Sequence, residues 1–529
     1  MYTESHGDES ALTAEKPLVF SKVTDPEFKK IFDYNDDYLH FLDASKTERL
    51  CCAEAVRQAE KAGFRPLSEF RSLAPGDKVY VNERNKAVIF YRIGTEAVTD
   101  GMNIVGAHID SPRLDLKPSP LYESDDLALF KTHYYGGIKK YQWVALPLAL
   151  YGTVVLKDGT KISLSIGDRE SEPVFCVSDL LIHLAGKQMA KKAAEVIEGE
   201  ELNLLVGSIP VKDEDVKEAV KKNILKKLQK EYGFTEADFA SAEFEAVPAG
   251  KARSVGFDES LVGAYAQDDR VCAYAALRGI LDLDETPART ACVILADKEE
   301  IGSVGSTGMN SRMFENDTAE ICALLGETDT NLAVRRTLRN SACLSADVTA
   351  GYDPTFASAF DPLNSAFIGK GAAICKYGGA RGKSGSNDAH PEFLAKLRGI
   401  FDDAGVFWQT CDMGKVDQGG GGGRYRHAER LEARADVARF LLRKRKDTGK
   451  LLNGGDAVGK LPFPVVPLRV RLRRFLNQRF NRLRFHFSFT AFFRDRRRSA
   501  WLRRGEFVTR GLHIPCRRTP RAWGSRYSA

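Results

Sequence analysis

The spacing of apolar positions near the start of the chain predicts two helices followed by a hairpin. Apolar side chains recur every three or four residues in EFKKIFDYNDDYLHFLDA and in SKTERLCCAEAVRQAEKAGF, both within residues 20–65, and this period is typical of amphipathic helices. Ser45 or Thr47 is the candidate N-cap of the second helix, and Gly63 is its candidate stop. The next segment, KVYVNERNKAVIFYRIG, predicts a β-hairpin with Asn82–Asn85 in its turn.

The pattern becomes rich in strands from about Pro118. YQWVALPLALYGTVVLKDGTKISLSIGD predicts paired strands with Lys157–Gly159 in the turn. DLLIHLAGKQMAKKAAEVI and VKEAVKKNILKKLQKEY then predict two amphipathic helices. Near Gly250 the earlier alternation returns, with a helix expected in YAQDDRVCAYAALRGILD. Short apolar runs predict buried strands in NIVGAHID, ACVILADKEE, SACLSADVT and VFWQTC.

Apolar strands separated by helical segments predict an α/β protein whose sheet is flanked by helices. A chain of 529 residues is also long enough for more than one domain. We therefore expect one sheet domain in two parts, residues 1–117 and 250–423, interrupted by a β-rich domain at residues 118–249. Residues 424–529 form a tail of different composition.

The charge of the chain is divided unevenly between these parts. The formal net charge is +6, but residues 424–529 contain 29 Lys and Arg against 7 Asp and Glu. The preceding residues contain 49 Lys and Arg against 65 Asp and Glu, so the body of the protein is acidic. Net charge therefore does not predict a nucleic-acid-binding body, and only the tail could bind nucleic acid in this way.

The remaining composition predicts a cytoplasmic protein. The segment MYTESHGDESALTAEKP is polar and acidic, unlike a secretory signal. No run of about 18 apolar residues occurs, so we expect no transmembrane helix. The 10 cysteines form no C-x-x-C pair, which favours reduced thiols over a disulfide framework.

Four polar clusters follow apolar strands or begin helices. They are His108 and Asp110 in AHID, Asp268 and Asp269 in QDDR, Asp297, Glu299 and Glu300 in DKEE, and Asp347 in SAD. In open α/β sheets, ligands bind beyond the carboxyl ends of the strands. We therefore expect these side chains to converge in space.

One imidazole and several carboxylates suit a site for zinc, with manganese and cobalt as alternatives. A shared carboxylate can hold two ions about 3.5–4 Å apart, where they activate one water. Of two adjacent glutamates, one can ligate metal while the other accepts the proton of the water. Simpler interpretations stay open at this point, because a lone histidine is often structural and acidic pairs often lie on a solvated surface.

A set of longer motifs resembles the M18 family of zinc aminopeptidases. The motifs are VGAHIDSPRLDLKP, YGGIKKYQW, DLLIHLA, AQDDRVCAY, ADKEEIGSVGSTG, LSADVTAGYDPTF, GSNDAHPEF and WQTCDMGKVDQGGGG. Their order and approximate spacing agree with the family over residues 20–422. The resemblance implies an α/β peptidase domain interrupted by a smaller β-rich dimerisation domain. It also implies homo-oligomers, in which dimers commonly assemble into dodecamers, and peptide substrates with a free N-terminus.

The same resemblance implies roles for individual residues of a site with two zinc ions. His108 and Asp347 would bind one zinc, Asp268 would bridge, and Glu300 would bind the second. Glu299 would be the general base, and Asp110 would orient His108. Two further residues are implied to contact substrate: His183, which resembles a histidine that reaches the active site of a neighbouring subunit, and Lys376.

The chain departs from the family after the glycines. Family members continue with a strand, a helix and a segment of the type S-M-H-[SA]-P, whose histidine completes the second zinc site. The histidines of the tail, His427, His486 and His513, stand in different surroundings, so none is assigned this role. The missing ligand leaves open an inactive or metal-deficient member of the fold.

Three explanations of the arginine-rich tail stay open. It could be an out-of-frame translation of a GC-rich gene, an added basic module that binds RNA or an anionic membrane, or a divergent end that still folds. The gene sequence around Gly423 distinguishes the first explanation from the others, because a frameshift would leave the S-M-H-P segment in another frame. Salt-sensitive RNA binding that is lost on truncation at Gly423 would identify the second.

Overall fold

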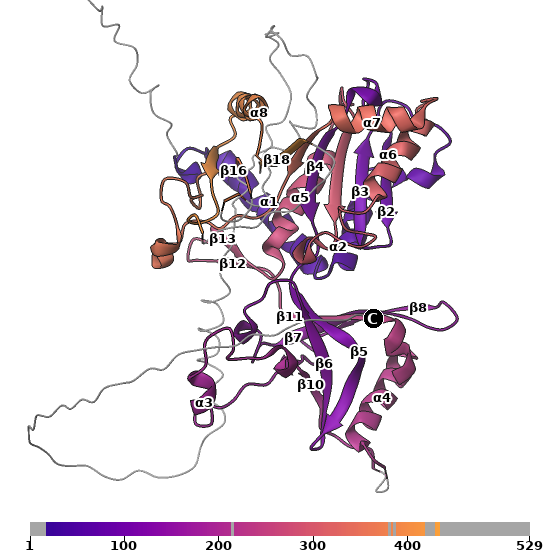
Figure 1. Cartoon of the computed structure of the whole chain (residues 1–529), viewed down its shortest axis with the longest axis vertical. Coiled ribbons are helices and arrows are strands. Elements are labelled where there is room, and N and C mark those ends of the chain that lie inside the picture. The colour runs from indigo at the N-terminus through magenta and orange to yellow at the C-terminus, as the bar shows by residue number, and fades with distance from the viewer. Residues whose placement is uncertain (1–16, 213–215, 379–381, 384–387, 418–428, 434–529) are drawn as a thin grey trace, which may run out of the picture. The chain divides into compact units, whose positions relative to one another are not determined.

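A computed structural model describes residues 17–212, 216–378, 382–383, 388–417 and, for the backbone alone, 429–433. The described residues form a nine-stranded sheet, a seven-stranded sheet and a two-stranded ribbon, with helices packed on the two larger sheets (Figure 1). The predicted α/β fold class is therefore confirmed. Residues 434–529 lie outside the described part of the chain.

The helices and the hairpin predicted near the start of the chain are confirmed. Helix α1 spans Asp25–Ala44, and helix α2 spans Glu48–Lys61. Of the two candidate caps, it is Thr47 whose side chain accepts a hydrogen bond from the backbone N–H of Leu50, which makes it the N-cap of α2. Strands β2, Lys78–Glu83, and β3, Ala87–Arg92, form the hairpin.

The nine-stranded sheet brings together strands from both ends of the described chain. Its order is β1-β2-β3-β14-β4-β15-β18-β16-β17. The bounds of the remaining strands are β1, Arg65–Pro66; β4, Asn103–His108; β14, Ala291–Ala296; β15, Ala342–Ser345; β16, Ala372–Cys375; β17, Trp408–Cys411; and β18, Glu429–Ala433. Strands β14, β4 and β15 are parallel neighbours, so their carboxyl ends share one edge of the sheet.

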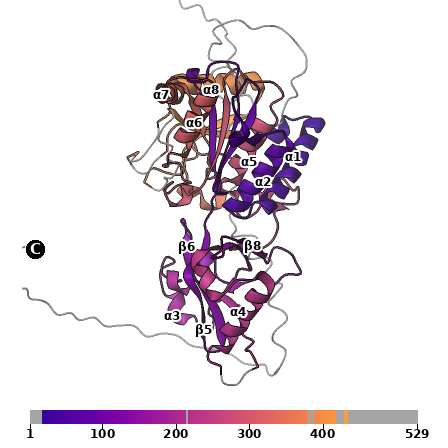
Figure 2. The same cartoon turned by 90° about the vertical axis from the view of Figure 1, so that its right-hand side faces the viewer.

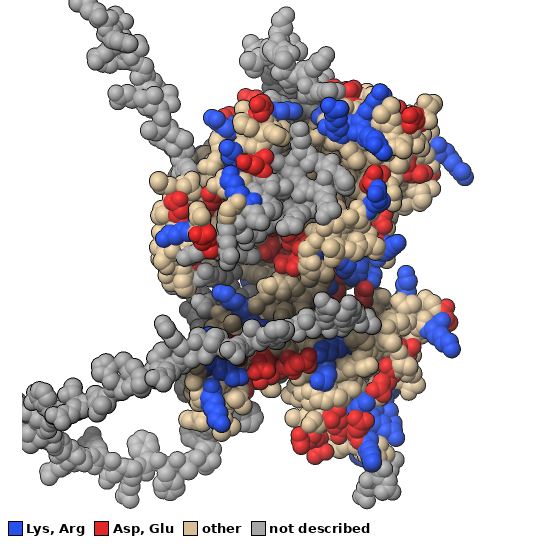
Figure 3. Space-filling view, in the orientation of Figure 1, with Lys and Arg blue, Asp and Glu red and all other residues tan. Residues whose placement is uncertain are grey.

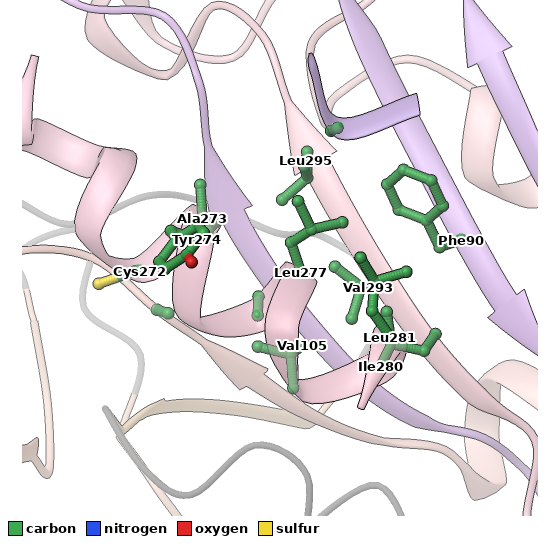
Figure 4. Close-up of a cluster of buried hydrophobic side chains, with 14 of the residues drawn as sticks. Phe90, Val105, Cys272, Ala273, Tyr274, Leu277, Ile280, Leu281, Val293 and Leu295 are labelled. Carbon is green, nitrogen blue, oxygen red and sulfur yellow. The ribbon is translucent and has the colours of Figure 1, made fainter. Parts of the chain in front are cut away.

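Both faces of this sheet are buried, because successive side chains of a strand point to opposite faces. In β3, Val88 and Phe90 pack in one apolar cluster, whereas Ile89 and Tyr91 pack in another. The first cluster includes side chains of α5, Gln267–Leu281, which lie over the strands as Figure 4 shows. Continuous apolar runs such as AVIFYR are typical of strands covered on both sides.

The helices divide between these two faces. Helices α1, α2 and α5 contribute to one cluster, together with α8, Pro391–Ala404. Helices α6, Met313–Leu324, and α7, Thr330–Asn340, contribute to the other. Figure 2 shows α6 and α7 on the opposite side of the strands from α1, α2 and α5. The predicted sheet with helices on both faces is thus confirmed.

The seven-stranded sheet is antiparallel, in the order β8-β7-β11-β5-β6-β10-β9. Its strands are β5, Arg113–Ser124; β6, Leu127–Tyr135; β7, Leu148–Val155; β8, Lys161–Ile166; β9, Cys176–Val177; β10, Leu204–Gly207; and β11, Ala242–Pro248. Helix α4, Ala219–Tyr232, packs against it. The ribbon of β12, Arg253–Val255, and β13, Leu261–Gly263, follows. The expected boundaries at 118 and 249 and the dimerisation role remain predictions.

The helix expected in DLLIHLAGKQMAKKAAEVI is wrong. Only the four residues of α3, Gly186–Met189, are α-helical there. Leu181, Ile182 and Leu184 are exposed by 61%, 64% and 72%. An isolated helix gains most of its stability from packing its apolar face, and the described residues supply no surface that covers this segment.

The departure from the family motifs after the glycines predicts that the strand found there in the family is missing from this chain. This prediction is wrong, because strand β18 follows the glycines. Strand β18 lies between β15 and β16, parallel to β15 and antiparallel to β16. The glycines of VDQGGGGG from Gly419 onward and the histidines of the tail lie outside the described residues.

On the face in Figure 3, Lys and Arg side chains of the described residues are interspersed with Asp and Glu. No described helix is long and apolar enough to cross a membrane.

Candidate metal centre

The polar clusters predicted from the sequence meet at the carboxyl edge of β14, β4 and β15. His108 is the last residue of β4 and lies opposite Ala296, the last residue of β14. Asp347 follows β15 by two residues, and Glu299 and Glu300 begin a short turn that follows β14. Parallel pairing in register therefore brings together side chains that are distant in sequence.

The start of α5 adds two adjacent carboxylates to this edge. Asp268 and Asp269 lie within the first turn, where both have non-helical backbone angles. His108, Asp268 and Glu300 each offer a ligand atom within 4.8 Å of the others, and the same holds for His108, Asp269 and Asp347. Both groups share the imidazole and could hold a metal ion.

The Nε2 edge of the His108 ring points at carboxylates. The Nε2 atom lies 3.2 Å from Asp268 Oδ1, 3.7 Å from Asp347 Oδ1 and 3.9 Å from Glu299 Oε2. The residue is only 2% exposed, and this nitrogen has no well-formed hydrogen bond among the described residues. A buried imidazole nitrogen directed at several carboxylates is the arrangement that a divalent metal ion requires of its ligands.

The other ring nitrogen faces Asp110. His108 Nδ1 lies 3.0 Å from the backbone oxygen and 3.3 Å from Oδ1 of Asp110. The Asp110 carboxylate also accepts hydrogen bonds from the backbone N–H groups of Glu299 and Glu300, at 3.0 and 3.1 Å. An Nδ1–H donated to Asp110 leaves the Nε2 lone pair free to ligate metal.

The glutamates of the site are difficult to ionise. Burial raises the pKa of Glu299 to about 7, and the charges of Asp347, Asp110 and Asp268 act in the same direction. Burial and Asp268 similarly raise the pKa of Glu300 to about 8. A divalent cation among these carboxylates would relieve their mutual repulsion, so the charge pattern fits a metal site.

The histidine responds in the opposite way to the same carboxylates. Burial by itself lowers the pKa of His108, but the nearby carboxylates of Asp110, Asp268 and Asp347 outweigh burial and raise it well above the usual range. A positive charge is therefore strongly favoured at this position. The donor set of one imidazole and several carboxylates fits zinc, and also manganese or cobalt.

Two residues that the family resemblance implicates lie elsewhere. His183 belongs to the exposed segment between β9 and α3. Lys376 is exposed at the end of β16 and lines a groove with Leu394 and Trp408. Within the described part of the chain, no hydrogen bond or ion pair connects either side chain to the metal cluster.

Two residues at the site have no role in the sequence interpretation. Asp269 was recognised only as a neighbour of Asp268, although it belongs to one of the two potential ligand groups. Tyr135, the last residue of β6, donates a hydrogen bond from its hydroxyl to Asp110 Oδ2 at 2.8 Å. The pair of acidic residues in QDDR was a signal for Asp269, whereas no local pattern indicates the contact of Tyr135.

A profile of the family described as Aminopeptidase I zinc metalloprotease (M18) matches residues 41–431. The protein named Probable M18 family aminopeptidase 1 of Clostridium acetobutylicum is 51% identical over 415 residues. The match covers 78% of this chain and 89% of that protein.

Two crystal structures are similar in fold as well as in sequence. The M18 family aminopeptidase from Thermotoga maritima has a TM-score of 0.76 at 41% identity, and aminopeptidase I from Clostridium acetobutylicum has a TM-score of 0.74 at 44% identity. Each comparison covers 81% of this chain and 98% of the other.

Proposed function

Because the chain belongs to the M18 family of zinc aminopeptidases, we propose that it releases N-terminal residues from peptides at a centre of two zinc ions. The observation that carries the proposal is the convergence of His108 with carboxylates from three other segments at one edge of the nine-stranded sheet. Manganese and cobalt are the alternative metals for this donor set.

The ligand roles are carried over from the family resemblance: His108 and Asp347 would bind one zinc, Asp268 would bridge, and Glu300 would bind the second. The two groups of potential ligands, His108 with Asp268 and Glu300 and His108 with Asp269 and Asp347, support the involvement of these residues. The short distance between His108 Nε2 and Asp268 Oδ1, 3.2 Å, supports a role for Asp268 beside the imidazole. Asp110 orients the His108 ring through Nδ1. This role is supported by the backbone N–H groups that hold the buried Asp110 carboxylate in place.

Glu299 is the general base of the proposed mechanism. Its carboxylate Oε2 lies 3.9 Å from His108 Nε2, so it borders the space that the ligands surround. When bound, the zinc ions supply Lewis acidity that activates water and polarises the scissile carbonyl. Glu299 would accept the proton of the attacking water and deliver it to the leaving amine.

A free α-amino group on the substrate restricts the reaction to the first residue of a peptide. This α-amino group would sit against a metal or a carboxylate of the centre. The exposed position of Lys376 beside β16 is compatible with a substrate contact, and His183 would act on a neighbouring subunit. Homo-oligomerisation, with dimers assembling into a dodecamer, is part of the same proposal.

A second candidate function has one specific observation in its favour. The sequence contains no S-M-H-[SA]-P segment that would supply the last histidine of the second zinc site. Catalytic zinc ions usually have about three protein ligands and a water. The alternative is therefore a member of the fold that binds one zinc tightly and hydrolyses peptides slowly or not at all.

The experiment combines metal analysis with a single substitution. We expect the purified full-length chain to bind two zinc ions and to hydrolyse aminoacyl p-nitroanilides. The Glu299→Gln variant should retain the metal and lose at least about a hundredfold in kcat, because general-base catalysis is removed. Glu320→Gln, on the exposed face of α6, is the matched control. One zinc or none and no turnover in the wild-type chain would favour the alternative.

A further inference from the structure

The seven-stranded sheet contributes a side chain to the metal centre of the nine-stranded sheet. Tyr135 ends β6, is 8% exposed, and donates its hydroxyl hydrogen to Asp110 Oδ2 at 2.8 Å. Asp110 is fully buried and faces His108 through its other oxygen. The Tyr135 phenol therefore contacts Asp110, and Asp110 in turn contacts the His108 imidazole.

The hydrogen bonds to Asp110 fix the orientation of its carboxylate. Oδ1 receives the N–H of Glu299 and faces the His108 ring, while Oδ2 receives the N–H of Glu300 and the hydroxyl of Tyr135. Both backbone donors belong to the turn that carries the predicted base and a predicted ligand. Without the hydroxyl, Oδ2 retains one of its two donors, so the carboxylate can rotate away from the imidazole.

A buried arginine holds the ring of Tyr135 in place. Arg113 on β5 is the direct cross-strand partner of Tyr135, and its guanidinium lies 3.8 Å from the ring centroid. The same guanidinium contacts Asp115 at 2.7 Å, Glu245 at 3.3 Å and Glu48 at 3.4 Å. Glu48 begins α2, so these ion pairs connect Arg113 both to the seven-stranded sheet and to this helix. Cation–π contacts of this kind strengthen when they are removed from water.

The next residue contacts a second member of the site. Gly136 has a φ of +73°, and a Cβ atom there would lie 3.2 Å from Glu300 Cβ and 3.3 Å from Glu300 Oε2. Such contacts are tight for a side chain, and this φ favours glycine. The Tyr135–Gly136 segment therefore borders both Asp110 and Glu300.

We propose that Tyr135 is a positioning residue of the metal centre, which acts through Asp110 on His108 and is itself held by Arg113. The inference rests on the proposed function. It assigns to the seven-stranded sheet a part in metal binding within the same chain, distinct from any part in subunit contacts. Gly136 leaves the space that Glu300 needs to reach the second ion of the same centre.

The test compares zinc affinity in the full-length wild-type chain and in three variants, by competition with a chromophoric chelator. In Tyr135→Phe the ring and its contact with Arg113 remain, and only the hydroxyl is removed. Tyr151→Phe is the matched control, because Tyr151 is a buried tyrosine of the same sheet whose hydroxyl donates to Asp168 at 2.8 Å. Gly136→Ala tests the contact with Glu300 independently.

We expect Tyr135→Phe to weaken zinc binding about tenfold, at the lower end of the effect of losing an outer partner of a ligand. The visible spectrum of the cobalt-substituted centre should change as well, because the imidazole shifts. Gly136→Ala should also weaken binding, and Tyr151→Phe should stay within about twofold of the wild type. Near-ultraviolet circular dichroism of each chain verifies the fold.

Three outcomes would overturn the inference. The first is a folded Tyr135→Phe variant with the zinc affinity and cobalt spectrum of the wild type. The second is an equal loss of affinity in Tyr151→Phe, which would assign the effect to general weakening of the sheet. The third is a wild-type chain that binds no zinc; in that case the proposed function fails, and this inference fails with it.

Discussion

At the scale of single residues, the centre separates two adjacent carboxylates that look equivalent in the sequence QDDR. The Asp268 side chain is 25% exposed and faces His108 Nε2 at 3.2 Å. Asp269 is fully buried and belongs to the group with His108 and Asp347. The chain turns between them with backbone angles that are not helical, so the two carboxylates point into different surroundings.

We predict that Asp268→Asn reduces zinc binding more than Asp269→Asn. The substitution keeps the shape of the side chain and removes its charge, and Asp268 is the proposed bridge between both ions. Metal analysis after dialysis against a weak chelator measures the zinc retained per chain, and we expect Asp268→Asn to lose about tenfold or more in affinity. A greater loss in Asp269→Asn would transfer the bridging role to Asp269.

At the scale of elements, helix α6 buries an acid on its packed face. Asp317 is 8% exposed, between the buried residues Phe314 and Ile321 of the same face. Its Oδ2 atom has no hydrogen-bond partner among the described residues. Burial, aided by the charge of Glu83, raises the pKa of Asp317 to about 7. Burial therefore favours the protonated form of the Asp317 carboxyl group.

We predict that Asp317→Asn stabilises the protein more at pH 8 than at pH 5. A carboxyl whose pKa is raised by folding lowers stability as the pH rises from about 3.8 towards about 7, because the unfolded chain releases the proton first. The gap between 3.8 and about 7 corresponds to on the order of 4 kcal/mol at most. Chemical denaturation at the two pH values measures the difference.

The control for this prediction is on the same helix. Glu320 is exposed, so Glu320→Gln should change the free energy of unfolding little at either pH. If Asp317→Asn instead destabilised the protein equally at pH 5 and pH 8, a water or polar partner would have to satisfy the carboxylate, and the raised pKa would not be the cause.

At the scale of the whole molecule, the apolar segment between β9 and α3 is exposed. Leu181, Ile182 and Leu184 are exposed and surround His183 in the sequence. Contiguous exposed apolar residues commonly mark contacts with other proteins. In the proposed homo-oligomer, this segment would pack against a second copy and would carry His183 to the site of that copy.

We predict that the double substitution Leu181→Glu and Ile182→Glu lowers the molar mass of the assembly. Two buried charges would oppose the contact, because desolvating unpaired carboxylates is costly. Light scattering coupled to size-exclusion chromatography measures the mass. Leu363→Glu, at a leucine that is 84% exposed elsewhere in the chain, is the control and should leave the mass unchanged. An unchanged mass in the double variant would contradict the proposed interface.

Local patterns predicted most of the elements that carry the candidate site. The run ACVILA indicated a buried strand, and both faces of β14 are indeed packed in apolar clusters with helices. The helix of QDDRVCAYAALRGIL was likewise evident from its spacing. The same local spacing misled in DLLIHLAGKQM, because period alone does not specify which surface, within this chain or outside it, covers the apolar side chains.

The sequence by itself determined the α/β class, the family and the set of chemically capable residues, since residue type, period and motif order are local properties of the chain. Only the tertiary structure decided the order of the nine strands, the pairing in register that brings His108 to Asp268 and Asp347, and the contact of Tyr135 with Asp110. The physical reason is that these relations join residues far apart in sequence, and the burial of both sheets selects them collectively.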